Sequence, residues 1–364
     1  MDRDLTAPES IVRALRLRRV RVSLHTPYRL SYRTFDEFEP FLVEVHDADG
    51  RLGLGEAHIS PGSSRETREG GWAFCIAMLP GLPGLPVAEA RRRVLAEAHR
   101  SPAAASAIVA ALEMLGGHTC LMPPRAVHQT LLAPMAATEP AAIEAEMERW
   151  VGAGYRTLKV KVGTDVAADL ERVRGIQRAG AGRVSLRLDA NRAFDRERAL
   201  AFAAGLDPAG IELFEQPCPT EAWDDNAAVA AACPVPLMLD EPICTLEDIR
   251  RAGAIPNVGF CKVKLKRFSG LGRLIEALDE VRAHGMGAVL GDGLGADLSG
   301  WMEAMAGAGR IHGAGEFNGF QKLSLGLLAE KLPADGPAMD IPAGYVPQLD
   351  LASVASRTEA EFTA

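Results

Sequence analysis

Short runs of apolar residues, each ending in a charged residue, recur along most of the chain. The runs read TLKVK, LRLDAN, IELFEQP, LMLDEP, CKVKL, AVLGDG and HGAGEFN. Their charged positions are Lys161, Asp189, Glu215, Asp240, Lys264, Asp292 and Glu316. Neighbouring positions lie 28, 26, 25, 24, 28 and 24 residues apart. This spacing suits one strand, one helix and their connections, so the pattern predicts a repeated strand–helix unit.

Helical patterns fill the gaps between these runs, as in EPAAIEAEMERWVGAG, DVAADLERVRGIQRAG and LGRLIEALDEVRAHG. With VHQTLLAP as a plausible first strand, eight strand-like segments alternate with helices, which favours a parallel (β/α) barrel. No GxGxxG or Walker pattern follows any strand, so a nucleotide-binding open sheet is disfavoured. In such a barrel the carboxyl ends of all strands face one active site.

The first part of the chain has a different pattern of apolar and polar residues. The run IVRALRLRRVRVSL alternates apolar and basic residues as an exposed strand does, and FLVEVHDADGRLGLGEAH predicts two strands joined at the hairpin signal Asp49-Gly50. Helical patterns follow from about 67 to 115. We therefore expect an α+β domain over residues 1–125 and a barrel over 126–334. The tail, 335–364, has strand and turn character, and we expect it to return to the first domain.

Composition narrows the class of protein. The chain has 364 residues and a net charge of −8, which gives no reason to expect nucleic acid or an anionic membrane as partner. No apolar stretch is long enough to span a bilayer, and the charged start lacks a signal core. Six cysteines without a CxxC pair indicate reduced thiols. These features favour a cytoplasmic enzyme.

Three acids end three successive predicted strands: Asp189, Glu215 and Asp240. Each acid alone could sit in a surface loop or cap a helix, and Asp240 in particular could cap the next helix. Together they would repel one another strongly unless a cation lay between them. Carboxylate oxygens suit Mg²⁺ or Mn²⁺, and no His-rich spacing suggests zinc. The pattern therefore predicts a magnesium site.

Lysines flank the acids in sequence order and so lie on opposite arcs of the barrel. Lys159 and Lys161 share one side of their strand, as do Lys262 and Lys264. Burial and a nearby cation lower the pKa of a lysine, and a general base works best near the operating pH. Lys161 on one face and Lys264 on the other could remove and return a proton from a substrate held between them.

These residues resemble an enolase-superfamily enzyme of the muconate lactonizing subgroup, related to mandelate racemase. The resemblance covers nearly the whole chain, through DGRLGLGE, GYRTLKVKVG, LRLDAN, FEQP, LDEP and KLKRFSGL. It implies a modified (β/α)7β TIM-type barrel with an α+β capping domain built from the N-terminal region and the tail. It also implies proton abstraction α to a carboxylate through an enediolate that Mg²⁺ stabilises, the general chemistry of this superfamily.

The resemblance assigns roles to individual residues. It implies Mg²⁺ on the three strand-end acids, Lys161 and Lys264 as acid/base residues, and Lys159 on the substrate carboxylate. Asn191 and Glu241 would support the metal site. Lys262 and Lys266 lie two residues before and after Lys264, so the assignment of the acid/base role to position 264 needs testing. The family also implies assembly into homo-oligomers.

The chain departs from the family at the specificity end of the pocket. Ser269-Gly270 replaces a paired glycine, and the DxD of dipeptide epimerases is absent from the eighth strand. We expect Asp292, Glu316 and Asn318 to contact the substrate, which would favour a cationic or amine-bearing group. Asp292 and Asp297 could equally cap a loop and a helix. The segment LHTPYRLSYRTFDEFEP is a candidate lid, offering as possible contacts His25, Tyr28, Arg33 and Phe35.

Three functions remain open. The first is a racemase or epimerase of an amino-acid-derived carboxylate. The second is a syn-dehydratase, an o-succinylbenzoate-synthase-like eliminase or a cycloisomerase on the same scaffold. The third is a metal-binding barrel without catalysis, against which the two lysines argue because binding alone needs no base on both faces.

Overall fold

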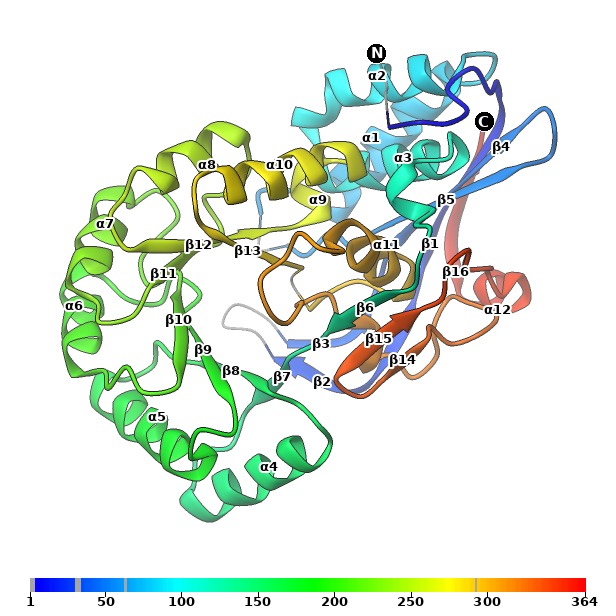
Figure 1. Cartoon of the computed structure of the whole chain (residues 1–364). Helices are drawn as coiled ribbons and strands as arrows, with labels where there is room; N and C mark the ends of the chain where they lie inside the picture. Colours follow the sequence, from blue (N-terminus) through cyan, green and yellow to red (C-terminus); the bar gives the residue numbers. More distant parts are fainter. Residues whose placement is uncertain (1–3, 30–33, 62–63, 292) are drawn as a thin grey trace.

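The computed structural model describes residues 4–29, 34–61, 64–291 and 293–364. A four-stranded antiparallel sheet of order β16-β1-β4-β5 joins the two ends of the chain (Figure 1). Its strands are β1 (Val12–Val20), β4 (Phe41–Asp47), β5 (Leu52–Ala57) and β16 (Thr358–Thr363). The tail thus returns to pair with β1, as expected. The hairpin at Asp49-Gly50 is confirmed, with Gly50 at φ +79°.

Helices cover this sheet. They are α1 (Arg68–Met78), α2 (Val87–Glu97) and α3 (Pro102–Leu115), with short 3₁₀ turns η1 (Leu79–Gly81), η2 (Ala98–Arg100) and η3 (Thr119–Leu121). The alanine-rich α3 packs directly on β5 and α9, because its buried small side chains permit close approach. A separate hairpin, β2 (Val22–Arg29) with β3 (Thr34–Phe38), reaches toward the barrel.

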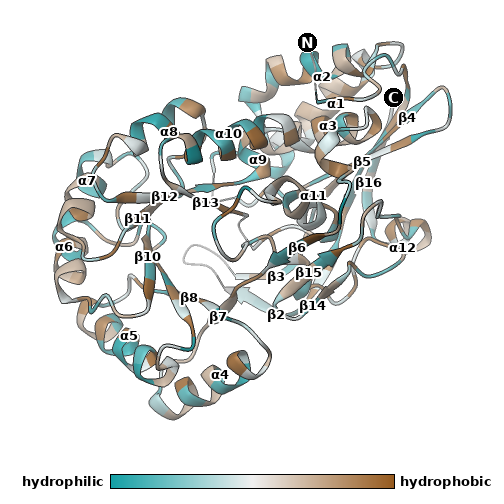
Figure 2. Cartoon of the chain, viewed as in Figure 1, coloured by the Kyte–Doolittle hydropathy of each residue, from teal (hydrophilic) through white to brown (hydrophobic). Residues whose placement is uncertain are grey.

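The barrel sheet is parallel, as predicted, and its strands β7 to β13 lie side by side in the same order as in the sequence. Its strands are β7 (Ala133–Met135), β8 (Thr157–Lys161), β9 (Ser185–Asp189), β10 (Ile211–Glu215), β11 (Leu237–Leu239), β12 (Val258–Val263) and β13 (Gly287–Leu290). Helices lie outside it: α4 (Pro140–Gly152), α5 (Val166–Gly180), α6 (Arg196–Gly205), α7 (Trp223–Ala232), α8 (Leu246–Gly253), α9 (Leu265–Phe268), α10 (Leu271–Ala283) and α11 (Asp297–Gly307). The hydrophilic colour in Figure 2 gathers on outer helices such as α5, α8 and α10. The predicted α/β barrel with a capping domain is confirmed.

Two predicted strands differ in detail. VHQTLLAP is divided into β6 (Val127–Thr130) and β7, because β6 pairs with β15 (Ala338–Ile341) in a small antiparallel sheet that includes β14 (Ala334–Asp335). RIHGAGEFNG forms no regular strand, but its backbone closes the barrel. Glu316 N donates to Leu290 O at 2.8 Å, and Gly315 N donates to Thr130 O at 2.8 Å. The chain then runs through η4 (Gly319–Lys322) and α12 (Leu351–Ser356).

No helix in the described ranges is long and apolar enough to cross a membrane. All six cysteines are free thiols, four of them buried, but Cys244 is exposed and so is not part of a core.

Candidate active site

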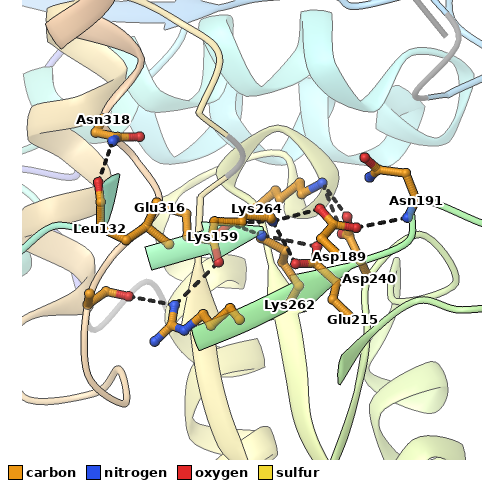
Figure 3. A network of polar contacts seen from close by, with 12 residues as sticks. Leu132, Lys159, Asp189, Asn191, Glu215, Asp240, Lys262, Lys264, Glu316 and Asn318 are labelled. Atoms are coloured by element: carbon orange, nitrogen blue, oxygen red, sulfur yellow. Dashed lines mark hydrogen bonds and ion pairs between the residues drawn. The ribbon is translucent and has the colours of Figure 1, made fainter. Parts of the chain in front are cut away.

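A cavity of about 620 Å³ opens at the carboxyl ends of the barrel strands. The predicted charges converge there because a parallel barrel brings successive strand ends together. The lining residues that were predicted are Tyr28, Lys159, Lys161, Asp189, Asn191, Glu215, Asp240, Glu241, Lys264, Glu316 and Asn318. Figure 3 shows a central group of these side chains turned toward one another: Lys159, Asp189, Glu215, Asp240 and Lys264. Asp292 and Arg33 lie outside the described residues.

The three predicted metal ligands are almost completely buried. Asp189 and Glu215 are direct partners across β9 and β10, each 1% exposed, and Asp240 follows β11 and is 3% exposed. Gln216 ties these strand ends together. It adopts a left-handed φ of 38°, and its Oε1 accepts a hydrogen bond from Asp240 N at 2.9 Å. In the FEQP motif, Glu215 therefore supplies the charge and Gln216 holds the backbone of the neighbouring strand end in place.

Lys159 lies among the carboxylates. Its Nζ is 2.9 Å from Asp189 Oδ2, 2.6 Å from Glu215 Oε2 and 2.8 Å from Glu316 Oε2. Burial lowers the pKa of Lys159, but the attraction of these three carboxylates outweighs burial and holds the pKa well above its ordinary value. Lys159 is therefore a fixed positive charge at the centre of the site.

Lys161 and Lys264 reach the cavity from different directions. Lys161 Nζ lies 2.6 Å from Asp189 Oδ2 and also donates to Asn191 Oδ1, and its side chain is 40% exposed. Lys264 Nζ lies 2.9 Å from Asp240 Oδ1, and its side chain is only 8% exposed. Their strands, β8 and β12, are separated in the sheet by β9, β10 and β11. The two ammonium groups therefore approach the carboxylates from opposite sides.

Glu316 lines the cavity, but its carboxylate engages the protein's own cations. Besides Lys159, it contacts Lys262 Nζ, and its Oε1 lies 3.3 Å from Arg187 Nη1. Burial raises the pKa of Glu316, but these three cations lower it by more than burial raises it, so the pKa lies below its ordinary value. Lys262 is 1% exposed and also lies 3.2 Å from Glu215 Oε1. Lys262 is thus part of the charge network, whereas Lys266 does not line this cavity.

Some predicted contacts fall elsewhere. The expectation for Phe35 is wrong, because its ring is 4% exposed and packs against Phe38 and His58 in the core. His25 is exposed and does not line the cavity. Asp297 is buried and accepts from Leu327 N at 2.9 Å, so it anchors the return segment. Asp240 does not cap the next helix, because Thr245 caps α8 with a capping box to Asp248.

Asn318, Asn191 and Glu241 have defined surroundings. Asn318 Nδ2 donates to Leu132 O at 3.0 Å, and the backbone N of Asn191 donates to Asp189 Oδ1 at 2.9 Å. Glu241 Oε1 lies 3.2 Å from Arg192 Nε. Burial and then the charge of Asp240 raise the pKa of Glu241 to about 7.

Sequence reasoning missed two arginines of the site. Arg267 Nη1 lies 2.8 Å from Asp240 Oδ1, and this arginine belongs to the KLKRFSGL motif three residues after Lys264. Arg172 on α5 donates to three backbone carbonyls at the ends of β7 and β8. The short spacing from Lys264 could have indicated Arg267, but no pattern indicates Arg172. The motif residue Ser269, where the resemblance implies a glycine, has φ 57°, a left-handed conformation that favours glycine.

The donor set fits a hard divalent cation. Three buried carboxylates end neighbouring strands, and Glu241 Oε2 is a buried oxygen without a hydrogen-bond partner in the described part of the chain. Among the described residues, no three His, Cys, Asp or Glu side chains are already gathered as a metal-binding group. The ammonium group of Lys159 lies 2.9 Å from Asp189 Oδ2 and 2.6 Å from Glu215 Oε2, so both carboxylates are paired with a cation of the protein itself.

Comparison with known proteins identifies the family. Residues 142–344 match the model of the enolase C-terminal domain-like family, which is more than half of the chain. The chain belongs to this family. The predicted superfamily and the prediction of an enzyme are thereby confirmed.

The most similar proteins of this family include several enzymes. The chain is 30% identical over 272 residues to the L-Lys-D/L-Arg epimerase of Methylococcus capsulatus, covering 68% of this chain and 73% of that one. It is 30% identical over 267 residues to the o-succinylbenzoate synthase of Geobacillus kaustophilus, covering 70% of each chain. Its fold matches a dipeptide epimerase of Cytophaga hutchinsonii complexed with Mg and D-Ala-L-Val, with a TM-score of 0.85, 19% identity, and 97% and 99% of the two chains covered.

Proposed function

We propose that this protein is a Mg²⁺-dependent racemase or epimerase that removes the proton α to a carboxylate in an amino-acid-derived acid. The observation that carries the proposal is the pair Lys161 and Lys264, which reach one cavity from strands on opposite sides of the carboxylates. Inversion at a carbon needs a base on one face and an acid on the other. A binding protein needs neither, which argues against a non-catalytic barrel.

Asp189, Glu215 and Asp240 would hold Mg²⁺, or Mn²⁺, with Asn191 and Glu241 supporting them. When bound, the cation would stabilise negative charge that develops on the substrate carboxylate. Lys159 lies beside two of these acids and would hold the same carboxylate by its fixed positive charge. Tyr28 and Asn318 line the cavity and are further candidates for substrate contact.

The proton transfers balance without a redox partner. A lysine amine on one face takes the α-proton, and the C–H electron pair is delocalised into the carboxylate as an enediolate. The ammonium group of the other lysine then donates a proton to the opposite face. A divalent cation and a monocarboxylate together add one positive charge to the cavity, which favours one lysine in its neutral form.

A syn-dehydratase of the o-succinylbenzoate synthase type is the second candidate. The 30% identity to such an enzyme over 70% of the chain supports it. In that reaction a single lysine could take the α-proton and then protonate the departing hydroxide on the same face. The other lysine would then contribute only its charge.

The test is isotope exchange with Mg²⁺ in D₂O. Amino acids, N-acyl amino acids, dipeptides and hydroxyproline-type acids are screened by NMR and mass spectrometry. Exchange with inversion supports the racemase, and loss of water supports the dehydratase. With a substrate found, Lys161→Ala and Lys264→Ala should each lower racemisation about 10²- to 10⁴-fold. Unchanged exchange of both enantiomers in Lys161→Ala would show that Lys161 is not a base.

A further inference from the structure

Arg172 fixes the backbone that carries Lys161. This arginine lies on α5, and its Nη1 donates to the carbonyl oxygen of Lys161 itself at 2.9 Å. Its Nη2 donates to Met135 O at 2.8 Å and its Nε to Ala137 O at 2.8 Å. A guanidinium group is planar and rigid, so these three bonds hold the ends of β7 and β8 in one fixed relation.

Glu303 fixes the backbone that carries Lys264. It lies on α11, is 7% exposed, and its Oε1 accepts a hydrogen bond from Leu265 N at 3.0 Å. Leu265 directly follows Lys264, at the point where β12 ends and α9 begins. A buried backbone N–H that loses its acceptor is costly, so this bond holds the strand end against α11.

The two anchors are independent of each other. Arg172 belongs to the helix after β8, whereas Glu303 belongs to the helix after β13. Neither contact involves an ammonium group or one of the three acids. Each of these hydrogen bonds therefore acts on the backbone beside one lysine.

We infer that Arg172 and Glu303 are positioning residues, one for each of the two lysines, and that each controls proton transfer at one face of the substrate. This inference rests on the proposed function. A displacement of about 1 Å can lower a rate on the order of 100-fold. Loss of one anchor should therefore weaken one base and leave the other in place.

Racemisation rates alone cannot reveal this asymmetry. The equilibrium constant fixes the ratio of the two directions, so a defect in either lysine slows both directions equally. Exchange of the α-proton with solvent is different, because the intact lysine still removes the proton from the enantiomer that it faces. That enantiomer exchanges with retention even when the other lysine cannot complete the inversion.

The experiment measures α-deuterium uptake into each enantiomer in D₂O with Mg²⁺. Lys161→Ala and Lys264→Ala first identify which enantiomer depends on which lysine. Glu303→Ala should then lower exchange of the Lys264-dependent enantiomer about 10- to 100-fold and leave the other within twofold. Glu303→Gln keeps an acceptor oxygen and should restore the wild-type ratio.

Arg172→Lys should produce the opposite asymmetry, because a lysine cannot reach three carbonyl groups at once. Arg174→Lys is the matched control. Arg174 lies on the same helix and donates to Gly205 O at 3.1 Å, away from the cavity, so its substitution should leave both exchange rates unchanged. The ratio of the two rates is insensitive to the folded fraction, so partial unfolding cannot imitate the effect.

The outcomes separate the two ideas. If the two lysine variants fail to affect opposite enantiomers, the proposed racemase mechanism is wrong. If they do so but Glu303→Ala and Arg172→Lys lower both exchanges in equal proportion, the positioning inference is wrong and the proposed function stands. Opposite asymmetries, with restoration by Glu303→Gln, support the inference.

Discussion

Glu215 is the direct partner of Asp189 across the parallel strands β10 and β9, and both carboxylates are buried at the strand ends. Burial and then the charge of Asp189 raise the pKa of Glu215. Burial has the same effect on Asp189, but Lys159 and Lys161 outweigh it and lower the pKa of Asp189. The two acids therefore depend on nearby cations to remain ionised together.

We predict that Asp189→Asn lowers Mg²⁺ affinity at least 100-fold. Loss of a hydrogen-bonding partner of a metal ligand typically costs about 10- to 100-fold, and loss of a ligand should cost more. Titration calorimetry at constant ionic strength measures the affinity. The control is Glu212→Gln, because Glu212 pairs with Arg187 at 2.9 Å and does not line the cavity. Equal Mg²⁺ affinity in the wild type and Asp189→Asn would exclude Asp189 as a ligand.

The strand ends could be predicted from sequence because a barrel repeats one unit with little variation. Lys161 pairs with Asp189 and Asp189 with Glu215 across neighbouring strands, as the even spacing implies. The contacts of these charges could not be predicted in the same way. Glu316 lines the cavity, and its cation partners come from three strands and are distant in sequence, so no local pattern indicates them.

Two segments, the VHQTLLAP run and the hairpin that carries Phe35, are buried by parts of the chain that their own sequence does not indicate. The VHQTLLAP run contains enough apolar residues for one strand, but β6 leaves the barrel to pair with β15, more than 200 residues later. Phe35 is polar-flanked in sequence, yet the hairpin turns it into the core. Local patterns report how a segment can be buried and not which distant segment buries it.

A second prediction concerns the buried ion pair Arg91–Glu113, whose Nε–Oε1 distance is 3.0 Å. Glu113 is fully buried and also accepts from Gly272 N at 3.1 Å, so α3 of the capping region holds the start of α10. Arg91→Leu should cost about 3–5 kcal/mol because it leaves a buried carboxylate without its cation. Urea unfolding measures the loss.

The double variant Arg91→Leu with Glu113→Gln should recover part of that loss, because the glutamine carries no charge. The control is Arg93→Leu, two residues further along the same helix. Arg93 pairs with Glu89 at 3.1 Å but is half exposed, so its loss should cost less than about 1 kcal/mol. Strictly additive effects at positions 91 and 113 would contradict the predicted coupling.

A third prediction concerns the pH dependence of stability at Glu56. Glu56 accepts from Ala296 N and from Ser299 N at 2.6 and 3.0 Å, and burial raises its pKa from 4.5 to about 7. The folded state therefore holds its proton to higher pH than the unfolded state. Its contribution to stability is full below about pH 4.5 and is lost as pH rises through 7.

We expect the wild type to lose about 2–3 kcal/mol relative to Glu56→Gln between pH 5 and pH 8. The glutamine keeps an acceptor oxygen for Ala296 N but has no titration in this range. Urea unfolding of both proteins at the two pH values measures the difference. Parallel pH dependences in the two proteins would show that Glu56 titrates at its ordinary pKa.

The final prediction concerns the glycines of the GLGE run, where β5 meets α3. A Cβ atom added to Gly55 would lie 1.9 Å from Ala107 O, and one added to Gly53 would lie 2.0 Å from Ala111 O. Both obstacles are helix backbone atoms, which cannot rotate away, so α3 would have to separate from the sheet. We expect Gly55→Ala to destabilise the protein by about 3 kcal/mol. The control is Gly152→Ala at the end of α4, where no atom lies within 4 Å of the new Cβ. That variant should be neutral or more stable by about 0.5–1 kcal/mol, because alanine favours the helix.

Thermal and urea unfolding measure the stability of Gly55→Ala and of Gly152→Ala. An equal effect of both substitutions would mean that close contact with α3 is not the reason for glycine at position 55.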